Sequence, residues 1–441
     1  MSNKTCRDVA ESGLCTGCGT CFSMCPKSAI TMGIDKRKGI YLPEFDERKC
    51  THCGICYEVC PGRLIGFGQI DCEAPVNQRE SNLIGKYLNC YIGHSTNPDI
   101  RYNSSSGGLV TQILAFALEN GMIDGAIVTR MKRDKPLEAE PFLARTKEEI
   151  YSASKSKYCP VPANVALRDI AEQKGRFAVV GLPCHILGIR KAEIQSKELR
   201  EKIVLHLGLF CSHTVNFLGT KILLERFGIN EEDVRQLDYR GMGWPGSLSV
   251  LLSNSHKEVF IYRQYWTLFS SYFFTPLSCM CCDDQINEMV DLSFGDAWLR
   301  DVKKKDKLGS SIVISRSEIG EKLLREAASM GVITLDRISY DRVVASQRSP
   351  LYFKKFGRGA RITILKRLGV KAPNQSWTRQ TANPLLYVVG LLQLSDAILS
   401  QRKSIHTVLK YVPSICLRGW SAFLYYLERV IYYSSAKKGE K

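Results

Sequence analysis

The 441-residue sequence predicts a protein of the mixed α+β or α/β class that consists of three regions. Three observations lead to this prediction. One cysteine pattern occurs twice near the N-terminus, short apolar runs alternate with helical patterns through the middle, and the C-terminal end is helical and strongly basic. Alternating runs of this kind are typical of a sheet with helices packed against it.

The repeated cysteine pattern reads C-x2-C-x2-C-x3-C-P in both copies. Three cysteines of one copy wrap around one 4Fe-4S cluster while the fourth reaches the other, as in a bacterial-type two-cluster ferredoxin. Zinc or disulfides are the alternatives, but zinc sites usually use two C-x2-C pairs. The predicted ligands are Cys15, Cys18, Cys21 and Cys60 for the first cluster, and Cys50, Cys53, Cys56 and Cys25 for the second.

The domain organisation follows from these patterns. We expect the ferredoxin domain to span residues 1–72 and a polar linker to run from Glu73 to Asn82. A mixed α/β region then covers residues 86–170 and 171–345, and a basic helical extension covers 346–441. Apolar runs and periodicity predict strands over 125–129, 177–181 and 203–210, and helices over 109–120 and 215–227.

The net charge of +17 lies in the last third of the chain. Residues 1–299 carry equal numbers of basic and acidic side chains, whereas residues 300–441 carry 27 basic and 10 acidic ones. Such a surface can simply keep a protein soluble, or it can meet a membrane or an acidic protein. The chain contains no nucleic-acid-binding motif, so we expect no nucleic-acid partner.

The start of the chain and its cysteine content bear on its location. Residues 1–15 lack the apolar segment of a secretory signal. The combination of 18 cysteines with oxygen-sensitive clusters predicts a cytoplasmic protein. One uncharged span, Gln264 to Cys282, includes Pro276, three cysteines and several polar residues, so we expect a buried segment rather than a transmembrane helix.

Two helices are predicted near the C-terminus, over 385–399 and 415–433. Apolar residues recur on one face of the second helix, which also carries aromatic and basic side chains. One hypothesis is that this helix docks on the protein's own body. The other is that it meets a partner or lies peripherally on the inner face of a membrane. The residues concerned are Leu417, Arg418, Trp420, Phe423, Leu424, Tyr425, Tyr426, Leu427, Arg429, Ile431, Lys437 and Lys438.

Two further features suggest cofactor binding. The segment Asn103 to Gly108 (NSSSGG) precedes a predicted helix, and glycines, serine hydroxyls and a helix N-terminus together suit a phosphate group. The alternative is an ordinary cap and turn. Separately, a C-x2-C pair and two cysteines at strand ends could bind a third 4Fe-4S cluster, or they could be buried free thiols. These cysteines are Cys184, Cys211, Cys279 and Cys282.

Seven short motifs occur in an order that resembles the beta-subunit family of coenzyme F420-reducing hydrogenases and F420H2 dehydrogenases. They are SSSGGLVTQIL, SKSKY, VGLPCHILGIRK, GLFCS, CMCCD, VDLSFGDAW and GSSIVISRSEIGEKLL, spread over residues 86–345. The resemblance implies an FAD-containing iron–sulfur flavoprotein. It implies that Ser105, Ser106, Gly107, Gly108 and Thr111 hold the FAD phosphates, that Lys157 and Asp296 lie near the cofactor, and that Cys184, Cys211, Cys279 and Cys282 bind the third cluster.

Two departures from the family pattern stand out. Many relatives have CHG where this chain has Cys211-Ser212-His213, which moves the histidine one residue away and puts a shared proton-transfer role in doubt. The extra Cys281 could replace Cys279 or Cys282 as a ligand.

The implied function is an oxidoreductase that passes electrons between a hydride carrier such as F420H2 and a one-electron acceptor, through FAD and 4Fe-4S clusters. A redox protein or complex partner is expected, and the direction of flow stays open. Two alternatives are a flavin and iron–sulfur reductase of an organic substrate linked to surface-polysaccharide synthesis, and a non-enzymatic ferredoxin-type carrier.

Overall fold

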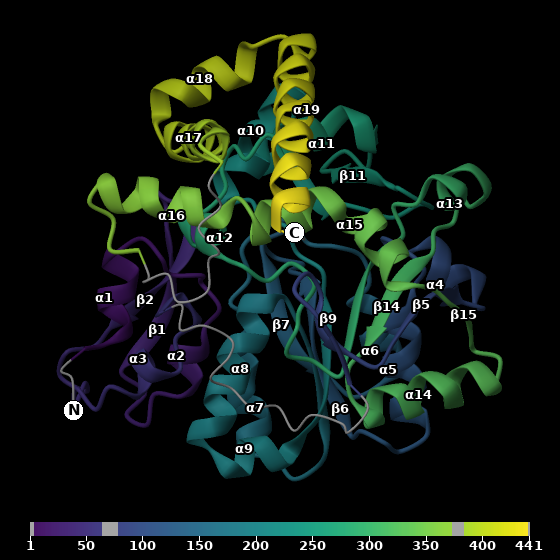
Figure 1. The fold of residues 1–441 in the computed structure, drawn as a ribbon. Helices are drawn as coiled ribbons and strands as arrows, with labels where there is room; N and C mark the ends of the chain where they lie inside the picture. The colour runs from purple at the N-terminus through teal and green to yellow at the C-terminus, as the bar shows by residue number, and fades with distance from the viewer. Residues whose placement is uncertain (1–3, 64–77, 373–382, 440–441) are drawn as a thin grey trace.

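The structure is a computed structural model, and it describes residues 4–63, 78–372 and 383–439. The ferredoxin region, a central sheet with its helices, and a group of C-terminal helices pack against one another (Figure 1). The elements in chain order are α1 Cys6–Glu11, α2 Thr20–Ser23, β1 Ile30–Asp35, β2 Ile40–Phe45, α3 Ile55–Glu58, η1 Pro61–Arg63, β3 Arg79–Ser81, β4 Gly85–Tyr87, β5 Asn89–Ser95, α4 Pro98–Tyr102, α5 Leu109–Glu119, β6 Gly125–Met131, β7 Ala139–Ala144, α6 Lys147–Ser152, η3 Ala163–Ala166, α7 Leu167–Ala171, β8 Phe177–Gly181, α8 Pro183–Gln195, α9 Lys197–Lys202, β9 Ile203–Leu209, α10 Phe217–Arg226, η4 Glu231–Asp233, β10 Val234–Asp238, β11 Ser247–Leu252, β12 Lys257–Ile261, α11 Tyr262–Ser270, α12 Leu277–Cys281, β13 Leu292–Asp296, α13 Arg300–Lys305, β14 Ser311–Ser315, α14 Glu318–Ser329, β15 Ile333–Arg337, α15 Tyr340–Lys355, α16 Arg358–Arg367, α17 Leu385–Leu399, α18 Lys403–Tyr411 and α19 Ser414–Gly439.

The ferredoxin region is built around its cysteine turns. A glycine with positive φ follows the second cysteine of each copy, Gly19 at 84° and Gly54 at 78°, and each glycine begins a one-turn helix, α2 or α3. Glycine adopts this backbone conformation without steric cost, so the chain can double back toward its own cysteines. Strands β1 and β2 pair antiparallel beside these turns.

The central sheet has eight strands in the order β15-β5-β14-β13-β9-β8-β6-β7. Strands β6, β8, β9 and β13 run parallel to their neighbours in this group, whereas the strands on both outer sides pair antiparallel. The sheet takes strands from both predicted parts of the middle region, 86–170 and 171–345, because β5 pairs with β14 and β15. The result is one mixed sheet, in agreement with the predicted mixed α/β architecture.

Helices cover both faces of the central sheet. On one face, apolar residues of α5 and α14 pack against the sheet, with Ile113 and Leu323 fully buried. On the other face, α7, α8 and α9 cover β6, β8 and β9 around Phe177 and Ile186. This layering buries both sides of the parallel strands, and their continuous apolar sequences require it.

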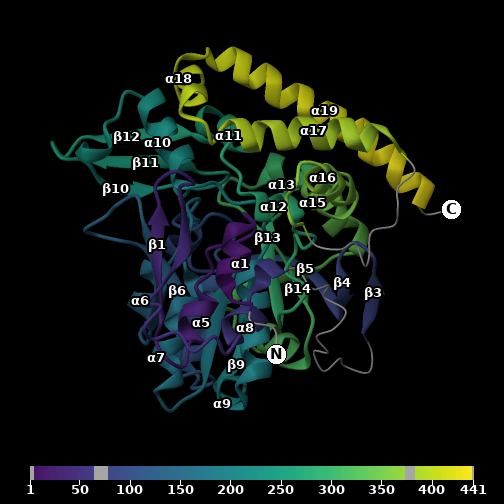
Figure 2. The same ribbon diagram turned by 90° about the vertical axis from the view of Figure 1, so that its left-hand side faces the viewer.

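The C-terminal helices lie together at one end of the molecule, at the top of Figures 1 and 2. The predicted apolar face of α19 packs on the protein itself, with Leu417, Leu424 and Ile431 buried. Helix α19 contacts α11, α15 and α17. The hypothesis that this helix docks on the protein's own body is therefore confirmed for this face. Among the described residues, no helix combines the length and apolar character needed to cross a membrane.

The predicted elements of the middle region agree with the structure within a few residues. The helix expected over 109–120 is α5, and the strands expected over 177–181 and 203–210 are β8 and β9. The predicted linker is partly wrong, because Arg79–Ser81 forms β3 and pairs with β4. Its first part, residues 73–77, and the side chains of Lys437 and Lys438 lie outside what the structure describes.

Candidate functional site

A cavity of about 1100 Å³ opens where the parallel strands of the central sheet end. Residues at the carboxyl ends of β6, β8, β9 and β13 line it, among them Thr129, Gly181, Leu209 and Asp296. Open α/β sheets bind ligands outside the carboxyl ends of their parallel strands. The cavity therefore lies where this topology places a binding site.

The serine-rich loop before α5 forms one wall of the cavity. Ser105, Ser106 and Gly108 line the cavity, as do Leu109 and Thr111 in the first turn of α5. The Ser106 hydroxyl donates to the carbonyl oxygen of Ser310 at 2.9 Å, and the Ser105 hydroxyl accepts a 2.7 Å hydrogen bond from the Ser156 backbone N–H. The middle of the loop is thus held by hydrogen bonds to two other segments, and the N-terminus of α5 faces the cavity, as anion binding requires.

The two glycines of this loop have different structural roles. Gly108 has φ +75° and begins α5, a conformation that favours glycine. Gly107 does not line the cavity; a Cβ there would lie 2.6 Å from the Gly93 carbonyl oxygen of β5. Its backbone N–H donates to Ser311 Oγ at 3.0 Å. Gly107 therefore seats the loop against the sheet, and its predicted role at a phosphate would be indirect.

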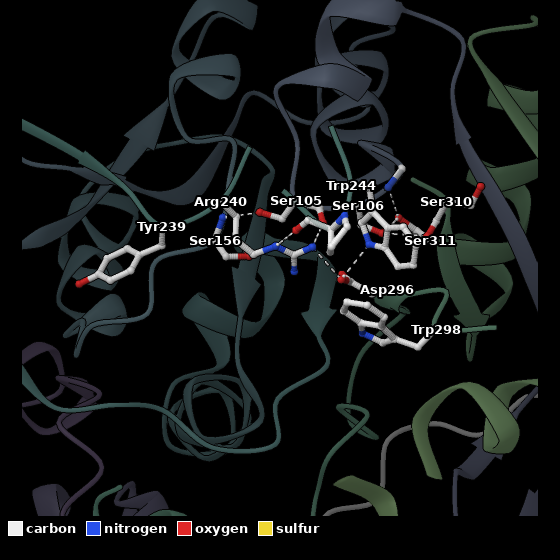
Figure 3. Close-up of polar contacts among 12 residues, drawn as sticks. Ser105, Ser106, Ser156, Tyr239, Arg240, Trp244, Asp296, Trp298, Ser310 and Ser311 are labelled. Carbon is white, nitrogen blue, oxygen red and sulfur yellow. Dashed lines mark hydrogen bonds and ion pairs between the residues drawn. The ribbon is translucent and has the colours of Figure 1, made fainter. Parts of the chain in front are cut away.

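Arg240, which sequence reasoning missed, connects the loop to the end of β13 (Figure 3). Its guanidinium forms a 2.9 Å ion pair with Asp296, donates to the Ser105 carbonyl oxygen, and donates from Nε to the Pro245 carbonyl oxygen at 2.8 Å. Burial alone would lower the pKa of Arg240, but the Asp296 carboxylate raises it, so the guanidinium stays charged. Trp244 Nε1 also donates to Asp296 at 3.2 Å. Asp296 itself lines the cavity.

Lys157 also borders the cavity, but its amine is turned to the backbone. Nζ donates to the carbonyl oxygens of Ala153, Ser154 and Lys155 at 2.6, 2.6 and 2.9 Å. Burial lowers the pKa of Lys157 to about 7. Three carbonyl acceptors match the three protons of an ammonium group and oppose this lowering. The side chain holds the 153–157 loop in place at the cavity wall.

Aromatic side chains form another wall of the cavity. Tyr262 and Trp266 stack with ring centroids 4.9 Å apart, and Tyr158 meets Trp266 edge-on at 5.2 Å. Trp298, after β13, lies 5.7 Å from Tyr262. All four line the cavity. Flat apolar walls of this kind suit a planar ring system and exclude water from it.

Four cysteines gather on the same cavity. Cys184 begins α8 after β8, Cys211 follows β9, and Cys279 and Cys282 come from α12 and its end; all four line the cavity. Burial raises the pKa of the Cys184 thiol well above its ordinary value, and Cys211, Cys279, Cys18 and Cys282 raise it further. Among the described residues, no three His, Cys, Asp or Glu side chains converge on one metal ion. The four thiolates of a cubane cluster surround four irons, so they stand farther apart than the ligands of a single metal ion.

The extra cysteine, Cys281, points away from this group. It is fully buried and packs in the apolar cluster formed with the C-terminal helices, and it does not line the cavity. Arg358 Nε donates to its carbonyl oxygen at 2.6 Å. The geometry therefore favours Cys279 and Cys282 over Cys281 as ligands.

Lys354, another residue that the sequence analysis missed, lies beside the cysteine group. It is 1% exposed, and Nζ donates to the Cys279 carbonyl oxygen at 3.2 Å. Burial alone would lower the pKa of Lys354, but the neighbouring Cys282, Cys279 and Cys211 raise it above the ordinary value. A buried positive charge of this kind offsets the negative charge of thiolates.

The ferredoxin cysteines lie in two groups in the structure. Burial raises the pKa of Cys60 well above its ordinary value, with further contributions from Cys15, Cys18 and Cys21, so these four lie together. Cys25, Cys50, Cys53 and Cys56 line a small second cavity. Lys191 of α8 donates to the Cys60 carbonyl oxygen at 2.8 Å. Because Cys15 and Pro61 also line the large cavity, the first group adjoins the cavity cysteines.

The two histidines beside the cavity cysteines have structural partners. His213 contacts the Phe269 carbonyl oxygen through Nε2 at 2.9 Å and Ser212 Oγ through Nδ1 at 3.2 Å. Burial lowers the pKa of His213 to about 4 and that of His185 to about 4. His213 is therefore neutral and held by the protein, which agrees with the departure from the CHG pattern.

The last helix also contributes to the cavity. Tyr425, Arg429, Tyr432 and Tyr433 of α19 line it, together with Arg348 of α15. Arg348 donates to the Tyr433 hydroxyl. The C-terminal region is therefore part of the wall of the site, which the sequence analysis did not foresee because the family motifs end before it.

The fold and the site define an iron–sulfur oxidoreductase, and comparisons with known proteins agree. Models for the N-terminal and C-terminal parts of the coenzyme F420 hydrogenase/dehydrogenase beta subunit match residues 90–168 and 174–341, and a 4Fe-4S dicluster model matches residues 14–63. The chain belongs to the coenzyme F420 hydrogenase/dehydrogenase beta-subunit family, and the predicted resemblance is confirmed.

Curated relatives and a solved structure support this assignment. Coenzyme F420 hydrogenase subunit beta from Methanothermobacter thermautotrophicus is 29% identical over 57% of this chain and 84% of its own length. Coenzyme F420-dependent sulfite reductase from Methanocaldococcus jannaschii is 30% identical over 79% of this chain, which spans about half (51%) of that protein. A chain of the F420-reducing NiFe hydrogenase complex from Methanosarcina barkeri shares the fold, with a TM-score of 0.52, 22% identity, and coverage of 65% of this chain and 96% of that one.

Proposed function

We propose that this protein passes electrons between a hydride carrier of the coenzyme F420 type and a one-electron acceptor, using FAD and three 4Fe-4S clusters. One observation carries the proposal. A single cavity brings together a helix N-terminus with its serine loop, an aromatic wall, and four cysteines, and the first ferredoxin group adjoins that cavity. A site that combines a place for a flavin with a group of cysteines suits a two-electron reaction coupled to single-electron transfer.

The residues at the cavity fit FAD. The N-terminus of α5, with the Ser105 and Ser106 loop, Gly108 and Thr111, would hold the phosphates, and Gly107 would keep that loop against the sheet. The ring system would lie against Trp266 and its aromatic neighbours, with Lys157 and Asp296 at the cavity border. Bound FAD would supply the conversion between hydride transfer and single-electron transfer.

The cysteine groups lie in series from the cavity to the surface. We assign Cys184, Cys211, Cys279 and Cys282 to a third cluster at the cavity, and Cys15, Cys18, Cys21 and Cys60 to the next cluster. The last group, Cys25, Cys50, Cys53 and Cys56, includes the exposed Cys53. A redox protein or complex partner would therefore exchange electrons at the exposed end of the ferredoxin region.

Anaerobic reductant titration tests the proposal. The purified, cluster-loaded protein is titrated with F420H2 and separately with NADH while its visible spectrum is recorded. We expect F420H2 to bleach the flavin and cluster absorption, with about twelve irons per chain for three cubane clusters. Iron without flavin would leave only an electron-carrier role. If the protein contains flavin and iron but neither donor reduces them, the substrate would be a dedicated organic molecule and not a hydride carrier.

A further inference from the structure

We propose that the outer side of helices α17, α18 and α19 docks on the anionic surface of a lipid membrane. These three helices lie together at one end of the molecule in both views (Figures 1 and 2). Their inner residues, including Leu394, Leu409 and Leu424, are buried in the protein. Their outer side includes large apolar residues that are exposed to solvent.

Helix α17 presents an apolar face to solvent. Leu385, Val388 and Leu391 are 52%, 50% and 54% exposed, and they recur at three-residue spacing on the outer face. The only charged residue of α17 is Asp396, which is buried and accepts a 2.7 Å hydrogen bond from Trp420 Nε1. A helix in water normally carries charge on its exposed face, so this outer face lacks the composition of an ordinary solvated helix.

Helices α18 and α19 extend the apolar surface with large side chains. Val408 and Tyr411 of α18 and Ile415, Tyr426 and Val430 of α19 are all more than half exposed. Ile415, Ala422, Tyr426 and Val430 recur on one side of α19 at helical spacing, opposite the buried Leu417 and Leu424. Exposed apolar side chains gathered on neighbouring helices mark an interaction site.

The charges around this surface have one sign. Arg402, Lys403, Arg418 and Arg429 are exposed. The two acidic residues within 383–439, Asp396 and Glu428, are both buried and hydrogen-bonded to Trp420 and Gln393. Every exposed charged side chain described in this range is therefore basic, which complements anionic lipid headgroups.

This combination of apolar, aromatic and basic side chains on neighbouring surface helices is that of interfacial helices. The single sign of the exposed charges excludes a basic protein partner, and exposed apolar side chains along three neighbouring helices beside basic ones suit an anionic lipid surface. Because Tyr425 and Arg429 of α19 also line the cavity, membrane docking would place one wall of the redox site near the lipid surface.

Vesicle co-flotation of the full, cluster-loaded protein tests the proposal. Vesicles of phosphatidylcholine alone are compared with vesicles that also contain phosphatidylglycerol, at low and high salt. We expect binding to the anionic vesicles, weaker binding to the neutral ones, and a decrease at high salt because salt screens exposed charges.

Two surface variants separate the apolar and the electrostatic contributions. The substitutions Leu385→Ser, Val388→Ser and Leu391→Ser together should weaken binding at least about tenfold. The substitutions Arg402→Gln, Lys403→Gln and Arg418→Gln together should weaken it on the order of 100-fold, from roughly fivefold per residue. Matched controls at exposed sites elsewhere are Ile194→Ser with Met330→Ser, and Lys197→Gln with Lys322→Gln.

The result that overturns the proposal is equally clear. Absence of wild-type binding to phosphatidylglycerol vesicles at low salt would reject it, as would equal binding by the wild type and both surface variants. Sedimentation that shows self-association of the wild type, abolished by the α17 variant while vesicle binding is absent, would assign the surface to a second copy of the chain. None of these outcomes depends on FAD or on the hydride donor.

Discussion

The Arg240 guanidinium and the Asp296 carboxylate form a 2.9 Å ion pair at the cavity wall. The pair joins the segment after β10 to the end of β13, and the same guanidinium donates to the Ser105 carbonyl oxygen. Both side chains are largely buried, at 4% and 16% exposure. The ion pair therefore couples the position of the serine loop to the end of the central sheet.

We predict that Arg240→Met lowers both stability and flavin content. Removing one partner of a buried pair leaves an uncompensated charge and costs about 3–5 kcal/mol. The measurements are the midpoint of chemical denaturation and the flavin-to-protein ratio after anaerobic purification. The control is Arg325→Met, whose guanidinium is 72% exposed beside Glu321 and should change stability by about 0–1 kcal/mol. Equal effects of the two substitutions would contradict the prediction.

Local sequence signals predicted the parts of the site that lie on single elements. The apolar runs of β8 and β9 placed Cys184 and Cys211 at strand ends, and the glycines before Leu109 marked the start of α5. These signals suffice because strand and helix limits depend on residues close in sequence. The serine loop, the buried strands and the cysteine patterns were therefore accessible without a structure, whereas the parallel direction of the strands was not.

The remaining residues depend on long-range packing. Arg240 meets Asp296 across 56 positions of sequence, and Lys354 reaches Cys279 from α15, so no local pattern identifies either contact. Buried basic residues look like surface residues in a sequence that is rich in lysine and arginine. The cavity wall formed by α19 was missed for the same reason, because its periodic apolar face indicates burial but not what lies beside it.

We predict that Gly107→Ala destabilises the serine loop. The added Cβ would lie 2.6 Å from the Gly93 carbonyl oxygen and 2.8 Å from the Ser311 backbone nitrogen, and neither backbone atom can move without shifting a strand. Overpacking of this kind costs about 1–3 kcal/mol. Chemical denaturation and flavin content are measured. Gly419→Ala is the control, because a Cβ there meets nothing within 4 Å and alanine favours the helix. An unchanged Gly107→Ala protein would mean that the loop adjusts freely.

We predict that iron content distinguishes the cavity cysteines. Cys282→Ala and Cys279→Ala should each remove the proposed third cluster and lower the iron count from about twelve to about eight per chain. Cys281→Ala should keep about twelve irons, because Cys281 is buried away from the cavity. Iron analysis and electron paramagnetic resonance of the reduced protein provide the two measurements. Loss of iron in Cys281→Ala alone would mean that Cys281 is a ligand in place of Cys279 or Cys282.

We predict that Lys354→Met lowers the reduction potential of the proposed third cluster. Reduction adds negative charge, which the Lys354 ammonium stabilises from its position beside Cys279 and Cys282. A charged hydrogen bond is worth roughly 1.5–3 kcal/mol, or about 60–130 mV for one electron. A redox titration followed by electron paramagnetic resonance measures the shift. Lys354→Arg keeps the charge and should retain most of the potential, whereas equal shifts in both variants would indicate a change of packing instead.

We predict that Asp396 makes the protein less stable as the pH rises. Burial raises the pKa of Asp396 to about 7, and the Trp420 hydrogen bond lowers it only in part. The folded protein therefore binds a proton that the unfolded chain has released, so stability falls between about pH 4 and pH 7 by up to ~1.4 kcal/mol per pH unit. Asp396→Asn keeps an acceptor for Trp420 and removes this loss.

The apparent Tm difference between Asp396→Asn and the wild type should therefore grow from pH 5 to pH 8. The control is Asp301→Asn: Asp301 is exposed, and the Arg342 hydrogen bond lowers the pKa of its carboxyl, so its pH dependence lies below about pH 4 and the Tm difference of this variant should stay constant from pH 5 to pH 8. A Tm difference that is constant across this range would mean that Asp396 is ionised in the folded protein throughout. The buried carboxylate would then need a cation that the present contacts with Trp420 do not supply.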